Sequence, residues 1–231
     1  MLQEKSPAAD TGKKRIFIVD DHPLVREWLA TLINQQADLK VCGEAGNATD
    51  AIKLITTAKP HVAIVDISME GISGLELIQQ IKATCPVLPE VKIIVLSMHD
   101  EQIYCERALR AGARGYIMKR DATQNVLQAI RSVLDGKLFL SRNIALMMAE
   151  RFVEGIQPAT RSQVELLSNR ELEVFRLLGR GQSTRQIAEQ IHVSFKTVQS
   201  FCARIKEKLQ LVNATALMNE AVRWHDREQE K

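Results

Sequence analysis

The sequence predicts an α/β domain built on a five-stranded parallel sheet, followed by a smaller all-α domain. Residues 13–134 alternate between five short apolar runs and amphipathic segments of helical length. The apolar runs lack the polar alternation of half-exposed strands, which is typical of parallel strands covered by helices on both faces. From Ser168 onward the apolar periodicity is helical throughout, so a second domain of helices alone is expected.

Polar side chains follow four of the five predicted strands. The strands are expected over residues 16–19, 41–45, 62–65, 93–96 and 115–118. Asp20, Asp66 and Ser97 follow the first, third and fourth of these, and Lys119 follows the fifth. Ligands of open α/β sheets bind at the carboxyl ends of the strands. We therefore expect these four side chains to meet at one edge of the sheet.

A change of pattern after Leu134 separates the two domains. Residues 135–137 break the last helix of the first domain, residues 141–152 predict a further helix, and residues 155–160 contain the Gly and Pro of a linker. The expected organisation is an α/β domain over 13–134, a partly helical linker over 135–162 and a helical domain over 163–228.

Composition limits the function without naming it. The 231 residues are 45% hydrophobic and 26% charged, which is ordinary for a globular protein. The net charge of +3 does not by itself indicate a nucleic-acid binder. The chain has no C-x-x-C or H-E-x-x-H pattern, no apolar segment of signal-peptide form and no run of about 20 apolar residues. We expect a cytoplasmic protein without a zinc site.

Three carboxylates, those of Asp20, Asp21 and Asp66, are expected at the same sheet edge. Their mutual repulsion raises at least one pKa unless a cation is present. An all-oxygen site with room for waters suits Mg²⁺. Lys119 adds a positive charge, Ser97 adds a hydroxyl that can donate to a phosphoryl oxygen, and Asp66 is central enough to act as the nucleophile of aspartyl-phosphate chemistry.

A single acidic residue at a strand end is usually only solvated, but the joint pattern of residues 14–134 resembles the receiver domain of two-component response regulators. The resemblance implies a flavodoxin-like (βα)5 fold. It implies the following roles: Asp66 as phosphoacceptor, Asp21 and Asp66 as direct Mg²⁺ ligands, Asp20 as a ligand mostly through water, Ser68 as a ligand through its backbone carbonyl, Lys119 as a catalytic cation, Ser97 as the catalytic and switch hydroxyl, and Tyr116 as the switch aromatic. Glu70 stands where the family often has Pro, and Tyr116 considered alone is more often a core residue.

The helical domain contains a predicted helix-turn-helix. Residues 184–191 and 195–209 form two helices with apolar faces, joined by a turn at residues 192–194. Capping boxes are expected at Ser168 with Glu171 and at Ser183 with Gln186. The second helix has a largely basic polar face that fits a major groove, although a solvated helix in a small bundle is the alternative interpretation.

The segments 167–174, 181–188 and 206–209 resemble the LuxR-type helix-turn-helix, which predicts a four-helix domain and assigns the whole chain to the NarL/FixJ class of response regulators. The residues expected at DNA are Ser183, Thr184, Lys196, Thr197, Gln199, Ser200, Arg204, Lys206 and Lys208. Gln199 replaces a residue that is usually basic, so a base preference does not transfer from the family.

The resemblances imply a DNA-binding regulator rather than an enzyme. A sensor histidine kinase would phosphorylate Asp66, and the phosphorylated homodimer would bind double-stranded DNA and act with RNA polymerase. The alternatives are a phosphatase or phosphotransferase that uses the same acidic cluster, and a regulator that acts through protein contacts alone.

Overall fold

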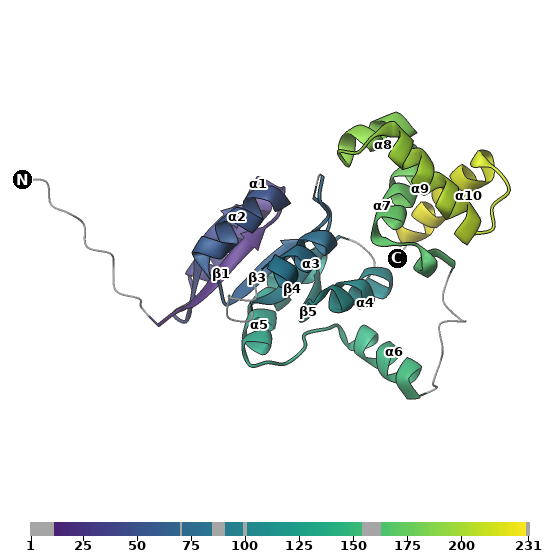
Figure 1. The fold of residues 1–231 in the computed structure, drawn as a ribbon. Helices are drawn as coiled ribbons and strands as arrows, with labels where there is room; N and C mark the ends of the chain where they lie inside the picture. Colours follow the sequence, from purple (N-terminus) through teal and green to yellow (C-terminus); the bar gives the residue numbers. More distant parts are fainter. Residues whose placement is uncertain (1–11, 70, 85–90, 99–100, 154–162, 230–231) are drawn as a thin grey trace, which may run out of the picture.

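The computed structural model describes residues 12–69, 71–84, 91–98, 101–153 and 163–229. Its first domain contains a five-stranded parallel sheet in the order β2-β1-β3-β4-β5 (Figure 1). The strands are β1 (Lys14–Val19), β2 (Leu39–Ala45), β3 (Val62–Asp66), β4 (Lys92–Ser97) and β5 (Gly115–Met118). The predicted fold class is confirmed.

Two strands end on functional candidates, because the ladder continues further than the apolar runs do. Asp66 is the last residue of β3, where it lies opposite Leu96, and Ser97 is the last residue of β4, where it lies opposite Met118. At the other end, β1 and β2 each begin two residues earlier than their apolar runs, at Lys14 and Leu39. Backbone pairing therefore holds both candidate side chains rigidly.

Helices cover both faces of the sheet. They are α1 (Pro23–Asn34), α2 (Ala48–Ala58), α3 (Gly74–Thr84), α4 (Glu101–Ala111) and α5 (Ala122–Leu134). Successive residues of β1 point to opposite faces: Ile16 and Ile18 are buried with α1 and α5, whereas Phe17 and Val19 are buried with α2, α3 and α4. This two-sided burial explains why the strands are apolar without alternation.

The segment after α5 contacts the receiver domain and then forms a further helix. Phe139 forms a parallel bridge with Gly115 at the edge of the sheet, and the Ser141 hydroxyl donates a 2.8 Å hydrogen bond to Glu101 of α4. Helix α6 (Arg142–Val153) follows. Residues 154–162 of the expected linker lie outside the described residues.

Four helices form the C-terminal domain: α7 (Asn169–Gly179), α8 (Thr184–Gln190), α9 (Phe195–Lys208) and α10 (Ala214–Gln229), preceded by a 3₁₀ helix at Gln163–Leu166. Both predicted capping boxes are confirmed, at Ser168 with Glu171 and at Ser183 with Gln186. Gly181 has φ +78°, the left-handed geometry that ends α7. Within the described residues, no helix has the length and apolar character needed to cross a membrane.

Candidate functional site

The sheet edge brings the predicted site together around Lys119. Asp20 and Asp66 are each 1% exposed, and the Lys119 ammonium lies 2.7 Å from Asp20 Oδ2 and 2.8 Å from Asp66 Oδ2. Lys119 itself follows β5 in a short 3₁₀ helix, Lys119–Asp121. Three strands therefore converge on one buried cluster with a single cation between two carboxylates.

The charges of this cluster depend on each other. Burial raises the pKa of Asp66, the Lys119 ammonium opposes that rise, and the neighbouring Asp20 carboxylate adds to it. For Lys119, burial favours the neutral amine, but the Asp66 and Asp20 carboxylates outweigh burial and raise the pKa of the lysine. Lys119 is therefore charged and holds one positive charge against two buried acids.

Asp21 brings a third carboxylate, and His22 brings a ligand type that the sequence prediction did not include. One donor atom each from Asp20, Asp21, His22 and Asp66 lies within 4.8 Å of the others. His22 Nδ1 is 2.6 Å from Asp21 Oδ1 and 3.2 Å from Asp20 Oδ1. The position of His22 directly after the Asp pair was the available signal, but its side chain is mostly exposed and it also starts α1.

The oxygens of this cluster fit a hard divalent cation. Asp20 Oδ2 and Asp21 Oδ1 are buried, and each has one close cationic or imidazole neighbour among the described residues, Lys119 and His22 respectively. Buried carboxylate oxygens in excess of the local positive charge are the donor set that Mg²⁺ binds. The residues present therefore fit the predicted ion.

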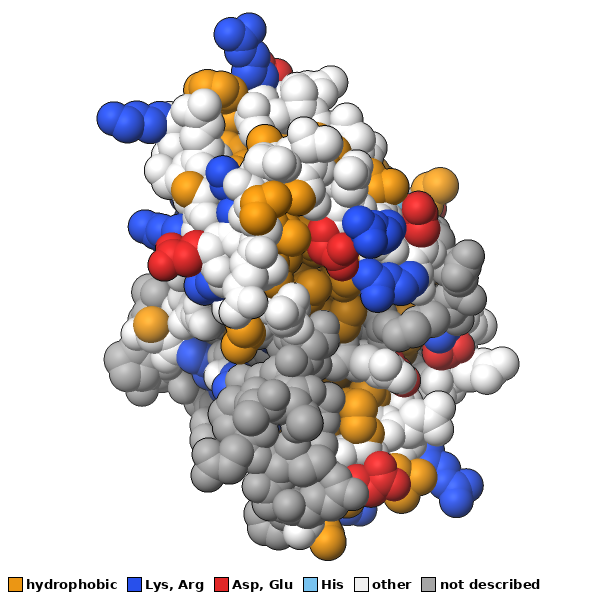
Figure 2. Space-filling model, turned by 90° about the vertical axis from the view of Figure 1, so that its right-hand side faces the viewer, with side chains coloured by type: hydrophobic (Ala, Val, Ile, Leu, Met, Phe, Trp, Pro, Cys, Tyr) orange, Lys and Arg blue, Asp and Glu red, His pale blue; other side chains and the backbone are white. Residues whose placement is uncertain are grey.

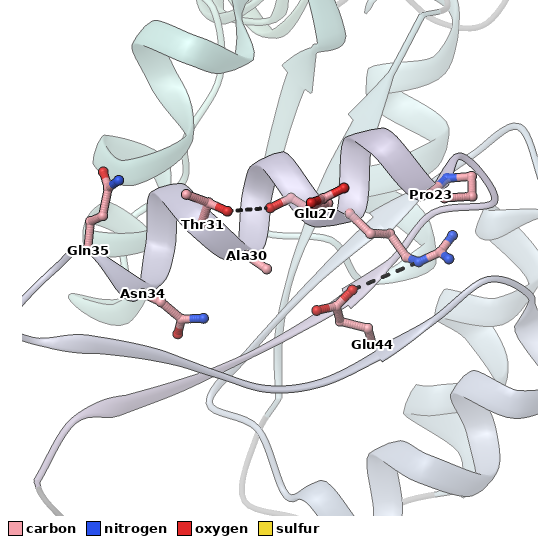
Figure 3. A pocket seen from close by; sticks show the side chains of 8 residues that line it. Pro23, Glu27, Ala30, Thr31, Asn34, Gln35 and Glu44 are labelled. Atoms are coloured by element: carbon pink, nitrogen blue, oxygen red, sulfur yellow. Dashed lines mark hydrogen bonds and ion pairs between the residues drawn. The ribbon is translucent and has the colours of Figure 1, made fainter.

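Arg26 of α1 fixes the end of β1. Its Nη1 donates a 2.7 Å hydrogen bond to the backbone carbonyl of Asp20, and its Nε lies 3.9 Å from Glu44 of β2. The same side chain lines an open polar groove beside α1 (Figure 3). The groove is lined by Pro23, Arg26, Glu27, Ala30, Thr31, Asn34, Gln35 and Glu44. None of the three carboxylates of the cluster lines it, so the groove lies beside the site and is linked to it through Arg26.

The loop of residues 67–73, called the β3–α3 loop below, directs the Asp66 side chain. The Ser68 amide donates a 3.1 Å hydrogen bond to Asp66 Oδ1, and the Gly74 amide donates a 3.1 Å hydrogen bond to the Ile67 carbonyl. A Cβ on Gly74 would lie 2.0 Å from the Asp66 carbonyl oxygen, so only glycine allows this close approach. Glu70, the departure from the family pattern, lies outside the described residues.

Ser97 and Tyr116 form a buried pair behind the carboxylates. Ser97 is fully buried, Tyr116 is 2% exposed, and a hydrogen bond joins the two side chains. Burial raises the pKa of Tyr116 well above its usual value, and the bond to Ser97 opposes this. The tyrosine therefore occupies an inward position in this structure, which agrees with the interpretation of Tyr116 as a core residue and leaves its switch role a prediction.

Helix α9 exposes part of the predicted DNA-contacting set. Lys196, Gln199, Ser200 and Arg204 are exposed; the last three follow Lys196 by three, four and eight residues, which places them on one side of the helix. Val198 and Ile205 are buried on the opposite side. The Ser200 hydroxyl donates a 3.0 Å hydrogen bond to the Lys196 carbonyl, so it is held by its own helix.

Other members of that set have structural partners. Lys208 Nζ lies 2.6 Å from Glu171 Oε2 and donates to the Leu166 carbonyl. Ser183 caps α8, and the Thr197 hydroxyl shares a hydrogen bond with Ser194, the cap of α9. Lys206 and Thr184 are half-buried. Figure 2 shows Lys and Arg side chains distributed around the face drawn there, among acidic and hydrophobic ones, instead of a single basic patch.

Both domains match known families. Residues 16–131 match the response regulator receiver domain, and residues 165–221 match the luxR family of bacterial regulatory proteins. The chain therefore belongs to the response regulators of two-component systems, in the NarL/FixJ class, with a receiver domain and a LuxR-type DNA-binding domain.

Relatives match over nearly the full length. The response regulator UvrY of Escherichia coli K12 is 37% identical over 90% of this chain and 93% of its own. The oxygen regulatory protein NreC of Staphylococcus aureus JH9 is 33% identical over 90% of this chain and 97% of its own. The solved structure of RcsB from Salmonella enterica serovar Typhimurium, bound to the promoter rprA with the phosphomimetic BeF3−, has a TM-score of 0.63 and 27% identity over 90% of this chain and 97% of its own.

Proposed function

We propose that Asp66 is the phosphoacceptor of this response regulator, and that its phosphorylation by a sensor histidine kinase promotes dimerisation and regulates transcription through the C-terminal domain. The observation that carries the proposal is the buried Asp66 carboxylate at the end of β3, 2.8 Å from the Lys119 ammonium and beside Asp20 and Asp21. In this arrangement a nucleophile, a cation and further carboxylate oxygens meet at one point.

In the proposed reaction, an Asp66 carboxylate oxygen forms a bond to phosphorus while the phosphorus–nitrogen bond of the kinase phosphohistidine breaks. The electron pair of that bond stays on the imidazole, which takes up a proton, and Asp66 becomes an acyl phosphate. Lys119 and Ser97 have the charge and the hydroxyl needed to bind the incoming phosphoryl oxygens.

Asp20, Asp21, Asp66 and the backbone carbonyl of Ser68 would hold Mg²⁺. Bound there, Mg²⁺ would neutralise part of the negative charge of the phosphoryl group and of the carboxylates. His22 lies within reach of Asp21 and orients that carboxylate by their 2.6 Å contact. Lys119 must then partly exchange its carboxylate partners for the phosphoryl group.

For output, Ser97 would bond the acyl phosphate of Asp66 and so change its bond with Tyr116. Helix α4 begins four residues after Ser97, so this rearrangement is expected to reach the surface of α4. The population of a dimerising conformation would rise as a result.

In the C-terminal domain, α9 would enter the major groove of double-stranded DNA. Lys196 and Arg204 are exposed and would meet phosphates, whereas Gln199 and Ser200 would meet base edges, Ser200 by accepting a hydrogen bond while its hydroxyl donates to the Lys196 carbonyl. The other predicted DNA-contacting residues would mainly stabilise the domain or contact DNA at the edge of the interface. They are Ser183, Thr184, Thr197, Lys206 and Lys208. The solved RcsB structure, which is bound to the promoter rprA, supports a DNA target of this kind. Contact with RNA polymerase and a cytoplasmic location stay predictions, as do the domain limits 13–134, 135–162 and 163–228.

Incubation with acetyl phosphate tests the assignment of Asp66. Intact-protein mass spectrometry should detect one added phosphoryl group in the wild type with Mg²⁺ and none with excess chelator. Asp66→Asn should stay unmodified, because an amide cannot attack phosphorus. Equal modification of Asp66→Asn and the wild type would refute the proposal.

A further inference from the structure

Helix α9 begins with an exposed aromatic side chain. Phe195, its first residue, is 42% exposed, whereas Val198 and Ile205 of the same helix are buried in the domain core. Phenylalanine is among the residues most often buried. Single apolar side chains at a surface are nevertheless common, so the exposure of Phe195 gains meaning only from its neighbour.

That neighbour is Arg185, the second residue of α8. The guanidinium carbon of Arg185 lies over the Phe195 ring, 6.0 Å from its centre, which is within the range of a cation–π interaction. The contact spans the turn of the helix-turn-helix and joins the first turn of α8 to the start of α9. The ring therefore sets the position of the Arg185 cation relative to the helix that is proposed to enter the groove.

The charge of Arg185 is not neutralised within the described part of the chain. Glu189 follows it by four residues, a spacing at which opposite charges pair on a helix. Both side chains are exposed, yet no carboxylate of a described residue lies within 4.0 Å of the Arg185 guanidinium. A guanidinium stacked on a ring still presents the N–H groups at its edge, which match the oxygens of a phosphate. Arg185 is therefore available to an anion outside the chain.

The place of Arg185 on the helix-turn-helix indicates which anion this is. When the second helix of the motif lies in the major groove, the first helix crosses the sugar–phosphate backbone. Arg185 belongs to that first helix, and its contact with Phe195 keeps it beside the end of α9 at which Lys196 is proposed to meet a phosphate. Two exposed cations, Arg185 and Lys196, thus lie at the end of α9 that is proposed to meet the edge of the groove.

We propose that Arg185 is a further contact of this protein with the DNA backbone, and that Phe195 is its positioning residue. The ring holds the guanidinium at the edge of the major groove, where it donates to one phosphate. The proposal rests on the proposed entry of α9 into that groove. A long side chain loses conformational freedom when it binds, and a guanidinium that is already stacked on a ring loses less. Phe195 therefore strengthens a contact that carries no base information.

The test is a salt-dependent titration of the full-length chain with Mg²⁺ and beryllofluoride. The wild type first selects a duplex from a random pool, and a scrambled duplex is measured beside it. Arg185→Ala should weaken binding to both duplexes by about fivefold at roughly 0.15 M salt and lower the salt slope by about one unit for each bound protomer, because one phosphate contact releases about one counterion. Arg223→Ala is the matched control, because Arg223 is an exposed arginine of α10 beside Glu220, and its slope should equal that of the wild type.

A double-mutant cycle tests the positioning role of Phe195. Phe195→Leu should weaken binding to both duplexes while Arg185 is present and should have no effect in an Arg185→Ala background, because residues that act through one contact are not additive. Phe195→Tyr keeps the ring, so its affinity should equal that of the wild type. Thermal unfolding should be the same in all these variants, since the substituted side chains are exposed.

Three results would overturn the proposal. They are an unchanged salt slope in Arg185→Ala, a loss in Arg185→Ala confined to the selected duplex, and equal effects of Phe195→Leu with and without Arg185. Lys196→Ala separates these results from a failure of the proposed function. If Lys196→Ala lowers the salt slope and Arg185→Ala does not, only the role of Arg185 is wrong. If neither variant changes the slope, the proposed entry of α9 into the groove is wrong as well.

Discussion

At the scale of single residues, the Asp66 carboxylate is buried and almost inaccessible to water. Burial raises the pKa of its carboxyl, and the nearby Lys119 ammonium opposes that rise. The Lys119 ammonium therefore stabilises the charged carboxylate form of Asp66, which is the form that acts as a nucleophile. The Ser68 amide then sets the direction of Oδ1 of this carboxylate, and Gly74 lets the chain pass close to the Asp66 backbone carbonyl.

Gly74→Ala should disable the phosphoacceptor without touching its carboxylate. The added methyl would meet the Asp66 carbonyl oxygen, which is backbone and cannot move cheaply. We expect at least a ~10-fold loss of beryllofluoride affinity, the equivalent of about 1.4 kcal/mol. Gly46→Ala is the control at the same sheet edge, because its Cβ would meet only the end of the Arg26 side chain at 3.4 Å. Unchanged affinity in Gly74→Ala would contradict the described loop geometry.

Ser97→Ala should uncouple phosphorylation from assembly. Asp66 keeps its carboxylate, but the hydroxyl that would bond the phosphoryl group is lost. Hydrogen bonds to charged groups contribute about 1.5–3 kcal/mol, so dimerisation in beryllofluoride should weaken by roughly tenfold or more. Sedimentation equilibrium measures this, with Ser132→Ala as a control on α5. If Ser97→Ala dimerised as strongly as the wild type in beryllofluoride, Ser97 would be a core residue without a switch role.

At the scale of elements, the strand ends could be predicted from the sequence, whereas the ion pair between Glu171 of α7 and Lys208 of α9 could not. Apolar runs in a parallel sheet end where the chain leaves the covered layer, which locates Asp66 and Ser97 from sequence alone. Lys208 was expected at DNA because it follows the polar periodicity of its own helix. Its partner Glu171 belongs to α7, and helical periodicity carries no information on contacts between helices. The ion pair between Arg170 of α7 and Glu76 of α3 escaped prediction for the same reason.

The buried Glu171 makes the C-terminal domain sensitive to acid. Burial raises the pKa of Glu171, but the hydrogen bonds from Lys208 and Ser168 outweigh burial and hold it below the ordinary value of 4.5. A carboxyl with a lowered folded-state pKa contributes stability above its unfolded pKa, and that contribution is lost as the pH falls through the folded pKa.

Glu171→Gln should therefore lower the stability of the domain at neutral pH by about 1–3 kcal/mol and flatten its decline below about pH 4.5. In a Trp28→Phe background, the fluorescence of Trp224 reports this domain, because Trp224 packs on Phe175 of α7 at a ring distance of 5.6 Å. Glu220→Gln, in a more exposed pair with Arg227, is the control. An identical acid profile in Glu171→Gln and the wild type would rule out the assigned role.

Helix α9 should read bases through Gln199 and phosphates through Lys196. Gln199→Ala is expected to cost about 1–3 kcal/mol on a preferred site and little on random DNA, since a base contact carries the discrimination. Lys196→Ala should weaken binding to all sequences and reduce the salt slope by about one unit. Salt-dependent titrations of both variants against preferred and scrambled duplexes measure this. If Gln199→Ala lost equal affinity for both duplexes, α9 would contact only the DNA backbone and would not read bases.

At the scale of the whole molecule, two sites share one set of interdomain bonds. Arg170 and Arg107 connect α7 and the segment before it to the two receiver segments nearest Asp66. A change at the phosphoacceptor can therefore alter docking of the DNA-binding domain directly. Phosphorylation at Asp66 is thereby proposed to control how strongly the protein binds its preferred DNA.

Selection from a pool of random duplexes, with and without beryllofluoride and Mg²⁺, tests this claim most directly because it needs no known operator. The wild type should enrich a specific sequence with beryllofluoride, with half-sites about 10 bp apart, and should enrich it weakly without. Asp66→Asn should enrich it weakly in both conditions. Equal enrichment by the wild type with and without beryllofluoride, or a beryllofluoride response that persists in Asp66→Asn, would contradict the account.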